Sequence, residues 1–259
     1  KMKINFDKYH GCGNDFIIVN NLSNTFPKDS ENQIKKICNR RFGIGADGLI
    51  LINHNDKFPF EMIYYNSDGK ISTMCGNGGR CVMHYCYNND IIENKSEFLA
   101  CDGIHHGIIN DDYVKVSMSD VNGYEKYNDY LFLNTGSPHL VKFVDDVSSL
   151  DLVNISRNIQ KSNRFDNGVN VNLVSRKNDN LYQIRTYERG VEDETLSCGT
   201  GAVASALALN ILSLINSKTV NLDTKGGLLT VDFNKSNSKY TDIHLSGKVK
   251  KVFTGILEL

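Results

Sequence analysis

The chain has 259 residues, of which 40% are hydrophobic, 23% charged and 9% aromatic. At about 150 residues per domain, this length corresponds to one large domain or two small ones. With 21 glycines and 3 prolines, the composition excludes collagen and disorder over the whole chain. The 29 Lys and Arg residues balance 30 Asp and Glu residues, which argues against a dedicated nucleic-acid-binding protein.

Targeting signals and cysteines in the sequence indicate the cellular compartment in which we expect the protein. Residues 1–5 lead into a polar stretch without the apolar segment of a signal peptide. The longest apolar segment, 205–215, is interrupted by Asn210 and Ser213 and is shorter than the roughly 20 residues that span a bilayer. The seven cysteines are an odd number, so we expect reduced thiols in the cytoplasm rather than disulfides.

Short apolar runs between Gly- and Asn-rich turns predict many strands and few helices. In chain order, we expect a strand at 16–19, a helix at 29–40, strands at 49–52 and 62–66, a short helix at 80–87, strands at 131–133, 141–144 and 183–188, and an Ala- and Leu-rich helix at 201–215. This pattern predicts the α+β class rather than an alternating parallel-sheet fold.

The two halves of the chain repeat the same landmarks. A Cys-Gly-x-Gly motif begins at Cys75 and again at Cys198, 123 residues later. The strands before the two motifs have nearly the same spacing, and His139 aligns with Asp15 at a spacing of 124. These similar spacings indicate a duplicated unit. The polar segment 121–129 is then the expected linker.

Each Cys-Gly-x-Gly motif comes at the start of a predicted helix. The first turn of a helix offers unpaired N–H groups and positive potential, which lower the pKa of a thiol and bind carboxylates. Inversion at a carbon acid needs a base on one face, an acid on the other, and donors for the carboxylate. Two opposed motifs therefore predict inversion at an amino-acid Cα without a cofactor, with Cys75 and Cys198 as acid and base.

Six segments, in order along the chain, resemble the signatures of the diaminopimelate epimerase family. They are HGCGNDF at 10–16, FGIGADG at 42–48, YNSDG at 65–69, MCGNGGRC at 74–81, YERG at 187–190 and SCGTGA at 197–202. The resemblance implies two similar domains, each a mixed β-sheet or barrel around a central helix, with the active site in the cleft between them. We expect these domains at 1–125, joined by the C-terminal strand 249–259, and at 126–248.

The resemblance also implies which residues form the site. The two acid/base groups would be Cys75 and Cys198. The residues that bind the α-carboxylate at the helix N-termini would be Gly76, Asn77, Gly199 and Thr200. The residues that hold the distal end of the substrate would be Asn14, Asn66, Asn170 and Arg189. Glu188 would lie near the reacting carbon and, together with His139, would tune the thiol pKa values.

The activity implied is the interconversion of LL- and meso-2,6-diaminopimelate in lysine and peptidoglycan-precursor synthesis. The resemblance implies a cytoplasmic homodimer that uses no cofactor and no metal and binds neither nucleic acid nor membrane. Two positions depart from the family in ways that touch substrate recognition. Ser137 stands where the family often has Asn, and Gly48 stands where some members carry Gln.

Other interpretations remain for several features. We expect Cys12, Cys81 and Cys86 to be packing residues and the His105-His106 pair to lie in a solvated turn. The GxGxxG at 43–48 precedes a strand instead of a helix, so it lacks the context of a dinucleotide site. The alternatives for the whole chain are a racemase for another amino acid such as histidine or hydroxyproline, a thiol-redox enzyme, and a non-enzymatic binding protein.

Overall fold

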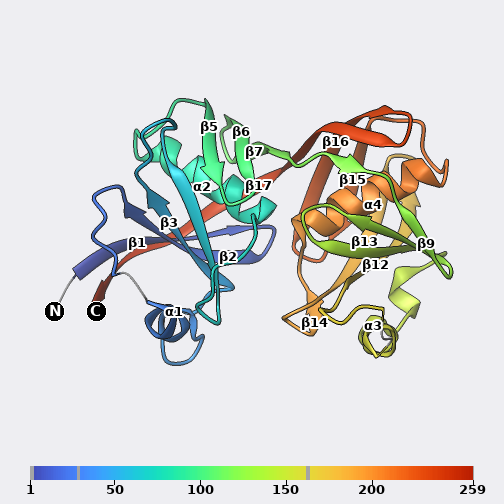
Figure 1. The fold of residues 1–259 in the computed structure, drawn as a ribbon, viewed down its shortest axis with the longest axis horizontal. Coiled ribbons are helices and arrows are strands. Elements are labelled where there is room, and N and C mark those ends of the chain that lie inside the picture. Colours follow the sequence, from blue (N-terminus) through green and yellow to red (C-terminus); the bar gives the residue numbers. More distant parts are fainter. Residues whose placement is uncertain (1–2, 28–29, 162–163, 259) are drawn as a thin grey trace. The chain divides into compact units, whose positions relative to one another are not determined.

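The computed structural model describes residues 3–27, 30–161 and 164–258 (Figure 1). It divides into two compact units. Unit 1 contains the described residues up to Val116 and from Gly247 onward, and unit 2 is Ser117–Ser246. The segment expected to be the linker contains two short strands, β8 (Val121–Asn122) and β9 (Glu125–Tyr127). β8 pairs with the start of β17 inside unit 2.

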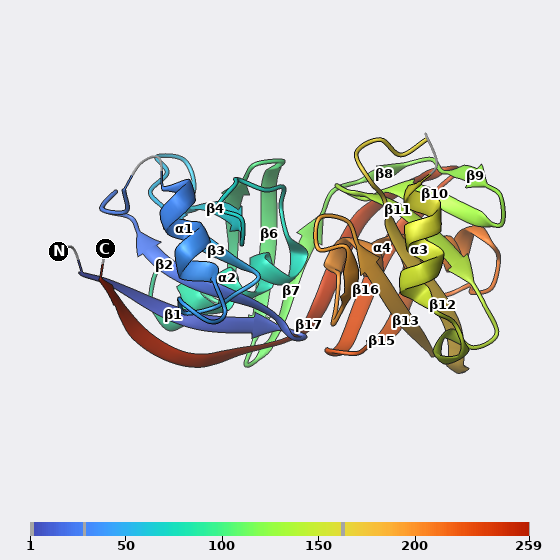
Figure 2. The same ribbon diagram turned by 90° about the horizontal axis from the view of Figure 1, so that it is seen from below.

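Unit 1 is built on a closed barrel of eight strands. Its strands are β1 (Lys3–Gly11), β2 (Asn14–Asn21), β3 (Gly48–Asn53), β4 (Glu61–Asn66), β5 (Lys95–Ala100), β6 (Gly103–Asn110), β7 (Tyr113–Met118) and the last part of β17 (Lys239–Glu258). Each strand pairs with the next, in parallel at β2–β3 and β4–β5, and β17 closes the ring by pairing with β7 and with β1. Figure 2 shows β1 and the end of β17 side by side.

The barrel of unit 1 encloses helix α2 (Gly76–Asn88), which contacts β1, β2, β3, β4 and β6 (Figure 1). The expected short helix thus begins four residues before the predicted start at 80. Glycine disfavours helix, so the sequence pattern hid this first turn. Burial overrides that cost, since every residue from Gly76 to Met83 is buried.

Helix α1 (Glu31–Cys38) covers the outer face of β2 and β3. Its apolar side chains Ile34 and Ile37 are buried against Ile17 and Leu49, because alternate strand residues face opposite sides of a sheet. The helix expected at 29–40 is therefore confirmed in its central part. Asp29 lies outside the described residues.

Unit 2 repeats this arrangement of strands. Its further strands are β10 (Tyr130–Asn134), β11 (Pro138–Phe143), β12 (Asn170–Asn178), β13 (Leu181–Glu188), β14 (Asp193–Thr195), β15 (Thr219–Thr224) and β16 (Gly227–Ser236). They pair in the order β9–β10–β11–β12–β13–β15–β16, in parallel at β11–β12 and β13–β15. The central helix is α4 (Gly199–Ile211), which contacts β10 to β13, β15 and β16. The α+β fold with mixed sheets around a central helix is confirmed in both units.

The strand registers show how closely the two units correspond. In unit 1 the parallel ladder pairs Phe16 with Gly48, and in unit 2 the equivalent ladder pairs His139 with Asn170. His139 lies 123 residues after Phe16 and Asn170 lies 122 residues after Gly48, so the two ladders correspond to within one residue, as does the sequence alignment of His139 with Asp15 at a spacing of 124. The cysteine motifs lie 123 residues apart, so the strands and the motifs repeat at nearly the same spacing.

The structure differs from the sequence prediction at two further helices. Helix α3 (Leu152–Gln160) was not expected, because its β-branched and Asn residues have weak helix propensity. Its start is fixed by Asp151, whose side chain accepts the Asn154 N–H. Helix α4 ends before the predicted 215, because Ser213 adopts a positive φ of 56°.

Packing of α4 predicts a large effect of truncating one of its leucines. Leu207→Ala removes a fully buried side chain and should lower the free energy of unfolding of unit 2 by about 2–5 kcal/mol. Leu214→Ala truncates a leucine that is 40% exposed and should change it by less than about 0.5 kcal/mol. Urea unfolding followed by circular dichroism measures both. Equal losses in the two variants would contradict the central position of α4.

Candidate active site

Each central helix begins directly after a cysteine. Cys75 caps α2 and Cys198 caps α4, and both have extended backbones, with φ and ψ of −108° and 116° for Cys75 and −131° and 117° for Cys198. The Sγ atom of Cys75 accepts a hydrogen bond from the Gly78 N–H at 3.5 Å. Helix geometry gives the first-turn amides of Gly76 and Gly199 no acceptor inside the helix. Thiol sulfur and anion-binding amides thus lie together in each unit.

The second glycine of each motif allows the helix to approach its surroundings closely. A Cβ added at Gly201 would lie 2.5 Å from Oδ1 of Asn172 and 3.3 Å from Cβ of Cys198. A Cβ at Gly78 would lie 3.1 Å from Ile50 and 3.2 Å from Met62. The recurring Cys-Gly-x-Gly pattern therefore has a packing reason as well as a chemical one.

In unit 1 a chain of polar side chains runs beside Cys75. Asn14 donates from Nδ2 to Asp47 at 2.7 Å, and its Oδ1 accepts from Asn77 Nδ2 at 3.3 Å. Asn77 in turn accepts at Oδ1 from Arg80 at 2.6 Å. The Sγ of Cys75 lies 3.6 Å from the same Oδ1 of Asn14, which accepts its hydrogen. The expected site residues Asn14, Cys75 and Asn77 are thus brought together.

Two charged residues next to this hydrogen-bonded series, Arg80 at one end and Asp15 beside Asp47 at the other, were not anticipated from the sequence. Arg80 is fully buried and donates from Nη1 to the carbonyl of Lys248 at 3.1 Å. Burial opposes the charge of Asp15, but hydrogen bonds from Arg40 and Lys8 outweigh it and lower its pKa to about 2. The available signal for Arg80 and Asp15 was that both lie inside the signature segments.

The same ion cluster holds Asp47. Arg40 contacts Asp15 at 2.6 Å and Asp47 at 2.7 Å with one nitrogen, Nη2. The backbone N–H of Asp47 donates to the Asp15 carboxylate at 3.1 Å. Asp47 therefore presents its acceptor to Asn14 from a fixed position.

In unit 2 a second chain of polar side chains leads to Cys198. Asn172 donates to Nδ1 of His139 at 3.0 Å, and Nε2 of His139 lies 2.9 Å from Oγ1 of Thr200. The Thr200 hydroxyl lies 3.4 Å from Sγ of Cys198. The series joins three of the expected site residues, His139, Thr200 and Cys198, and begins at Asn172, which sequence reasoning missed. Asn172 gave no local signal, because a polar residue within an apolar strand is recognised only once its partner across the ladder is known.

His139 is neutral at physiological pH. Its ring is fully buried, and this burial, assisted by the positive charge of Arg189, lowers its pKa to about 3. A buried neutral imidazole next to Thr200 is a fixed hydrogen-bonding group rather than a charged one.

Asn170 is buried, and both the nitrogen and the oxygen of its side-chain amide form hydrogen bonds within the protein. Its Nδ2 donates to Ser137 Oγ and to the Pro138 carbonyl, both at 2.9 Å, and its Oδ1 accepts the Arg189 N–H at 3.0 Å. It thereby connects the loop before β11 with the loop after β13. Ser137, which departs from the family pattern, takes part in this connection.

The remaining expected residues lie at strand ends. Glu188 is the half-buried last residue of β13, and Arg189 follows it with Nη1 donating to the Asn167 carbonyl at 3.2 Å. Asn66 ends β4, is exposed, and begins a tight turn in which the Gly69 N–H donates to its carbonyl at 2.9 Å. At Gly48 a Cβ would lie 2.4 Å from the Tyr65 carbonyl oxygen, so this backbone has no room for a side chain.

The other five cysteines lie away from the helix N-termini. Cys81 and Cys86 are fully buried along α2, and Cys12 is buried in the β1–β2 turn, which confirms them as packing residues. Burial also raises the pKa of Cys38 to about 12. All seven cysteines lie in the described part of the chain, and no disulfide joins any of them there.

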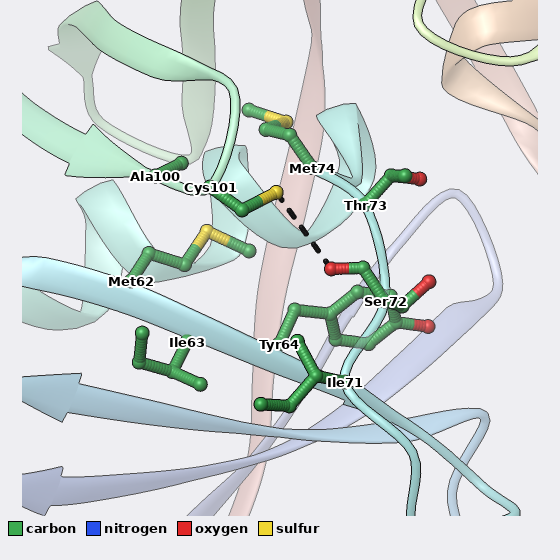
Figure 3. Close-up of a pocket in the computed structure, with 9 residues that line it drawn as sticks. All are labelled: Met62, Ile63, Tyr64, Ile71, Ser72, Thr73, Met74, Ala100 and Cys101. Carbon is green, nitrogen blue, oxygen red and sulfur yellow. Dashed lines mark hydrogen bonds between the residues drawn. The ribbon is translucent and has the colours of Figure 1, made fainter.

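Cys101 is the exposed thiol, and it borders a small pocket of unit 1 (Figure 3). Its Sγ donates to the Ser72 carbonyl at 3.7 Å, between the sulfur-containing side chains of Met62 and Met74. The pocket measures about 20 Å³, room for a single water molecule. An amino acid does not fit there.

The expected solvated turn at the histidine pair is wrong. His105 lies in β6, is 3% exposed, stacks on Phe98 and contacts Asp102 at 2.9 Å. Alternation along the strand buries His105 and leaves His106 exposed.

Two searches of the described residues bear on the class of protein. No group of three or more His, Cys, Asp or Glu side chains among them is arranged to hold a metal ion. None of the helices in ranges 3–27, 30–161 and 164–258 is long and apolar enough to cross a membrane.

The low pKa of His139 predicts a pH dependence of stability. The unfolded chain binds a proton near pH 6.5 and the folded chain only near pH 3, so stability falls as pH decreases through this window. The loss attributable to His139 should be about 1.4 kcal/mol per pH unit within the window. Urea unfolding of His139→Gln should show this dependence reduced, whereas His54→Gln, at an exposed histidine, should keep it. Identical pH dependences of wild type and His139→Gln would contradict a buried neutral imidazole.

Comparisons with known proteins show the family to which this chain belongs. The family model for diaminopimelate epimerase matches residues 6–122 and 131–252. The diaminopimelate epimerase of Flavobacterium psychrophilum is 48% identical over 248 residues, which cover 95% of this chain and 97% of that protein. The enzyme of the same name from Aquifex aeolicus is 37% identical, with 97% of both chains covered.

Solved structures show the same fold at low sequence identity. A Bacillus anthracis protein of the PhzF phenazine biosynthesis family superposes with a TM-score of 0.80 at 13% identity, covering all of both chains. A hydroxyproline epimerase from Agrobacterium vitis has a TM-score of 0.74 at 13% identity, covering 99% of this chain and 91% of that one. The matched segments include both cysteine motifs, and the chain belongs to the diaminopimelate epimerase family.

Proposed function

We propose that this chain is a diaminopimelate epimerase that interconverts LL- and meso-2,6-diaminopimelate by a two-base mechanism. One observation carries the proposal: each of two repeated units places a cysteine at the N-cap of its central helix. Membership of the family, at 48% identity to a relative of that name, supports the same activity.

The proposed reaction moves one proton off the substrate Cα and one proton onto its opposite face. A thiolate takes the Cα proton and becomes a thiol, and the electron pair left behind is delocalised into the α-carboxylate. The other thiol then donates its proton to the opposite face and becomes a thiolate. No electrons are gained or lost, so the reaction needs no redox cofactor. The reverse reaction exchanges the roles of Cys75 and Cys198.

We assign the α-carboxylate to the N-termini of the two central helices. Amides of Gly76 and Asn77 in α2, and of Gly199 and Thr200 in α4, lie in first turns where the helix dipole favours an anion. Donors held in place before the reaction stabilise the negative charge that develops on the carboxylate oxygens.

We assign the distal end of the substrate to Asn14, Asn66, Asn170 and Arg189, with Glu188 near the reacting carbon. Arg189 suits a carboxylate because its planar guanidinium can bind both oxygens. Asn170 supports Arg189 indirectly, since its Oδ1 accepts the Arg189 backbone N–H. His139 is proposed to influence Cys198 through Thr200, the residue that lies between them.

The biological setting follows from the same proposal. The reaction would serve lysine and peptidoglycan-precursor synthesis, without a cofactor or metal, in the cytoplasm. Two thiols that must stay reduced require a reducing compartment. We also propose that the enzyme works as a homodimer, as the family resemblance implies.

Turnover of LL-diaminopimelate by the reduced protein tests this proposal. Chiral chromatography should show meso product, and Cys75→Ser and Cys198→Ser should each lower the rate at least about a hundredfold. Cys101→Ser, at an exposed cysteine away from both helix N-termini, should keep the rate within about twofold.

Two results would overturn the proposed function. Inversion of hydroxyproline or histidine without inversion of diaminopimelate would move the chain to another racemase activity. Retention of more than about a tenth of the rate in either active-site variant would contradict the two-base mechanism.

A further inference from the structure

We infer that Arg80 is a positioning residue of the proposed reaction. It holds the side chain of Asn77 in one orientation and places a positive charge beside the first turn of α2, where the α-carboxylate is assigned. The inference rests on the proposed function for the place of that carboxylate. Two observations carry it: the guanidinium is completely buried without an ion pair to any described residue, and it donates to Asn77 at 2.6 Å.

Arg80 is the largest fully buried side chain in the described part of the chain. Its Nη1 donates to the Lys248 carbonyl at 3.1 Å and its Nη2 to Oδ1 of Asn77 at 2.6 Å, and both acceptors are neutral. Within residues 3–27, 30–161 and 164–258, Nε has no hydrogen-bond partner and no carboxylate pairs with the guanidinium. Because arginine keeps its proton in proteins, unit 1 holds a full positive charge here.

Three elements of unit 1 hold this guanidinium in place. It donates to α2 through Asn77 and to β17 through the Lys248 carbonyl. On the side of β1, a Cβ added at Gly11 would lie 3.1 Å from Nη2 of Arg80 and 3.3 Å from the carbonyl oxygen of Asn77. The charge therefore has a fixed place in the barrel, beside the second residue of α2.

The fold itself does not need an arginine at this position. In unit 2, Val203 lies 123 residues after Arg80, the spacing that also separates the two cysteine motifs, and it is fully buried in α4. A buried charge without a carboxylate partner costs stability. Proteins keep such costly groups mainly where function uses them, so the arginine of unit 1 indicates a role in the site.

The hydrogen bond from Arg80 sets the direction of two side-chain amides. Arg80 is a donor only, so the carbonyl of Asn77 faces it and the NH₂ group of Asn77 faces Oδ1 of Asn14 at 3.3 Å. On the other side, the NH₂ group of Asn14 faces Asp47, which is an acceptor, at 2.7 Å. Arg80 thereby fixes the orientation of two residues assigned to substrate binding.

The charge of Arg80 also acts on the carboxylate assigned to this end of the helix. The first-turn amides and the helix dipole already favour an anion there. The guanidinium, hydrogen-bonded to Asn77, adds a whole charge close by. Removal of the Cα proton increases the negative charge on the carboxylate oxygens, so the attraction is stronger in the transition state than in the bound substrate.

Neighbouring charges leave this effect in place. Asp47 lies beyond Asn14 at the far end of the series and is itself paired with Arg40 at 2.7 Å. Within α2, burial raises the pKa of the Cys81 thiol and the charge of Arg80 opposes this rise. The charge is therefore felt by an ionisable group of the same helix.

Two substitutions separate the charge of Arg80 from its hydrogen bonds. Arg80→Met removes both and keeps an unbranched apolar stem, whereas Arg80→Lys keeps the charge without the planar fork. With LL-diaminopimelate as substrate, Arg80→Met should lower kcat/KM at least about a hundredfold, and kcat itself should fall, because the lost attraction is strongest in the transition state. Arg80→Lys should recover at least about tenfold of that loss.

Val82→Ala is the matched control, because it truncates a fully buried side chain of the same helix without changing a charge. Its kcat/KM should stay within about threefold of wild type. Circular dichroism checks that each variant is folded, and Arg80→Gln, with the same expected loss, replaces Arg80→Met if the latter is not. Equal losses in the methionine and lysine variants, or no loss in either, would overturn the inference.

A measurement on the free protein detects the charge without substrate. Iodoacetamide labelling of Cys75, followed against pH by peptide mass spectrometry, reports the titration of a thiol at the N-cap of α2. A nearby positive charge favours the thiolate, so Arg80→Met should move the midpoint upward by about one pH unit and Arg80→Lys should move it less. The midpoint of Cys198, at the N-cap of α4, should move less than about half as much. An unchanged Cys75 midpoint in Arg80→Met, or an equal shift of both cysteines, would contradict the inference.

The two readouts separate this inference from the proposed function. A shift of the Cys75 midpoint in a protein that does not turn over diaminopimelate would leave the charge at the helix end standing and remove the substrate assignment. Turnover of diaminopimelate by the wild type, with Arg80→Met equally active and the Cys75 midpoint unchanged, would leave the proposed function standing and overturn the inference.

Discussion

A cysteine at the N-terminus of a buried helix is the arrangement on which both halves of this protein depend. The central helix of each unit is enclosed by strands, so its first turn lies at a fixed place in the sheet. That turn offers amide donors and positive potential to whatever anion lies there. The third residue of each helix is a glycine, Gly78 or Gly201. A side chain there would collide with the neighbouring residues and push the helix away from them. Fold and chemistry therefore share the same few residues.

The two units keep this arrangement but surround it with different polar groups. His139 and Phe16 begin the parallel ladders of the two units, one with a buried imidazole and the other with a fully buried apolar ring. In unit 2 the hydrogen-bonded series from Asn172 to Thr200 leads to Cys198, and in unit 1 the series from Asp47 to Arg80 runs beside Cys75. The two units therefore place different polar side chains beside their cysteines.

Part of this could be predicted from the sequence, and the rest could not, for physical reasons. The cysteine motifs and the apolar strands are local patterns, so the positions of Cys75 and Cys198 before the central helices were predicted, together with six of the strands in the described residues: β2, β3, β4, β10, β11 and β13. The first turn of α2 was missed because its glycines have poor helix propensity and only burial stabilises it. Asp47 and Asn172 act through partners far away in the chain, and no local pattern reveals a hydrogen bond across a sheet. His105 was misplaced because strand alternation, not its polarity, decides its burial.

The central claim is that two different thiols handle the two protons, and the position of deuterium in the first turnovers tests it most directly. The reduced protein is incubated with LL-diaminopimelate in deuterated water and sampled at low conversion. The account predicts that meso product carries deuterium at the inverted carbon while recovered LL-diaminopimelate remains protiated, because each thiol serves one face only. Deuterium appearing equally in recovered substrate and in product would indicate a single base serving both faces and would contradict the account.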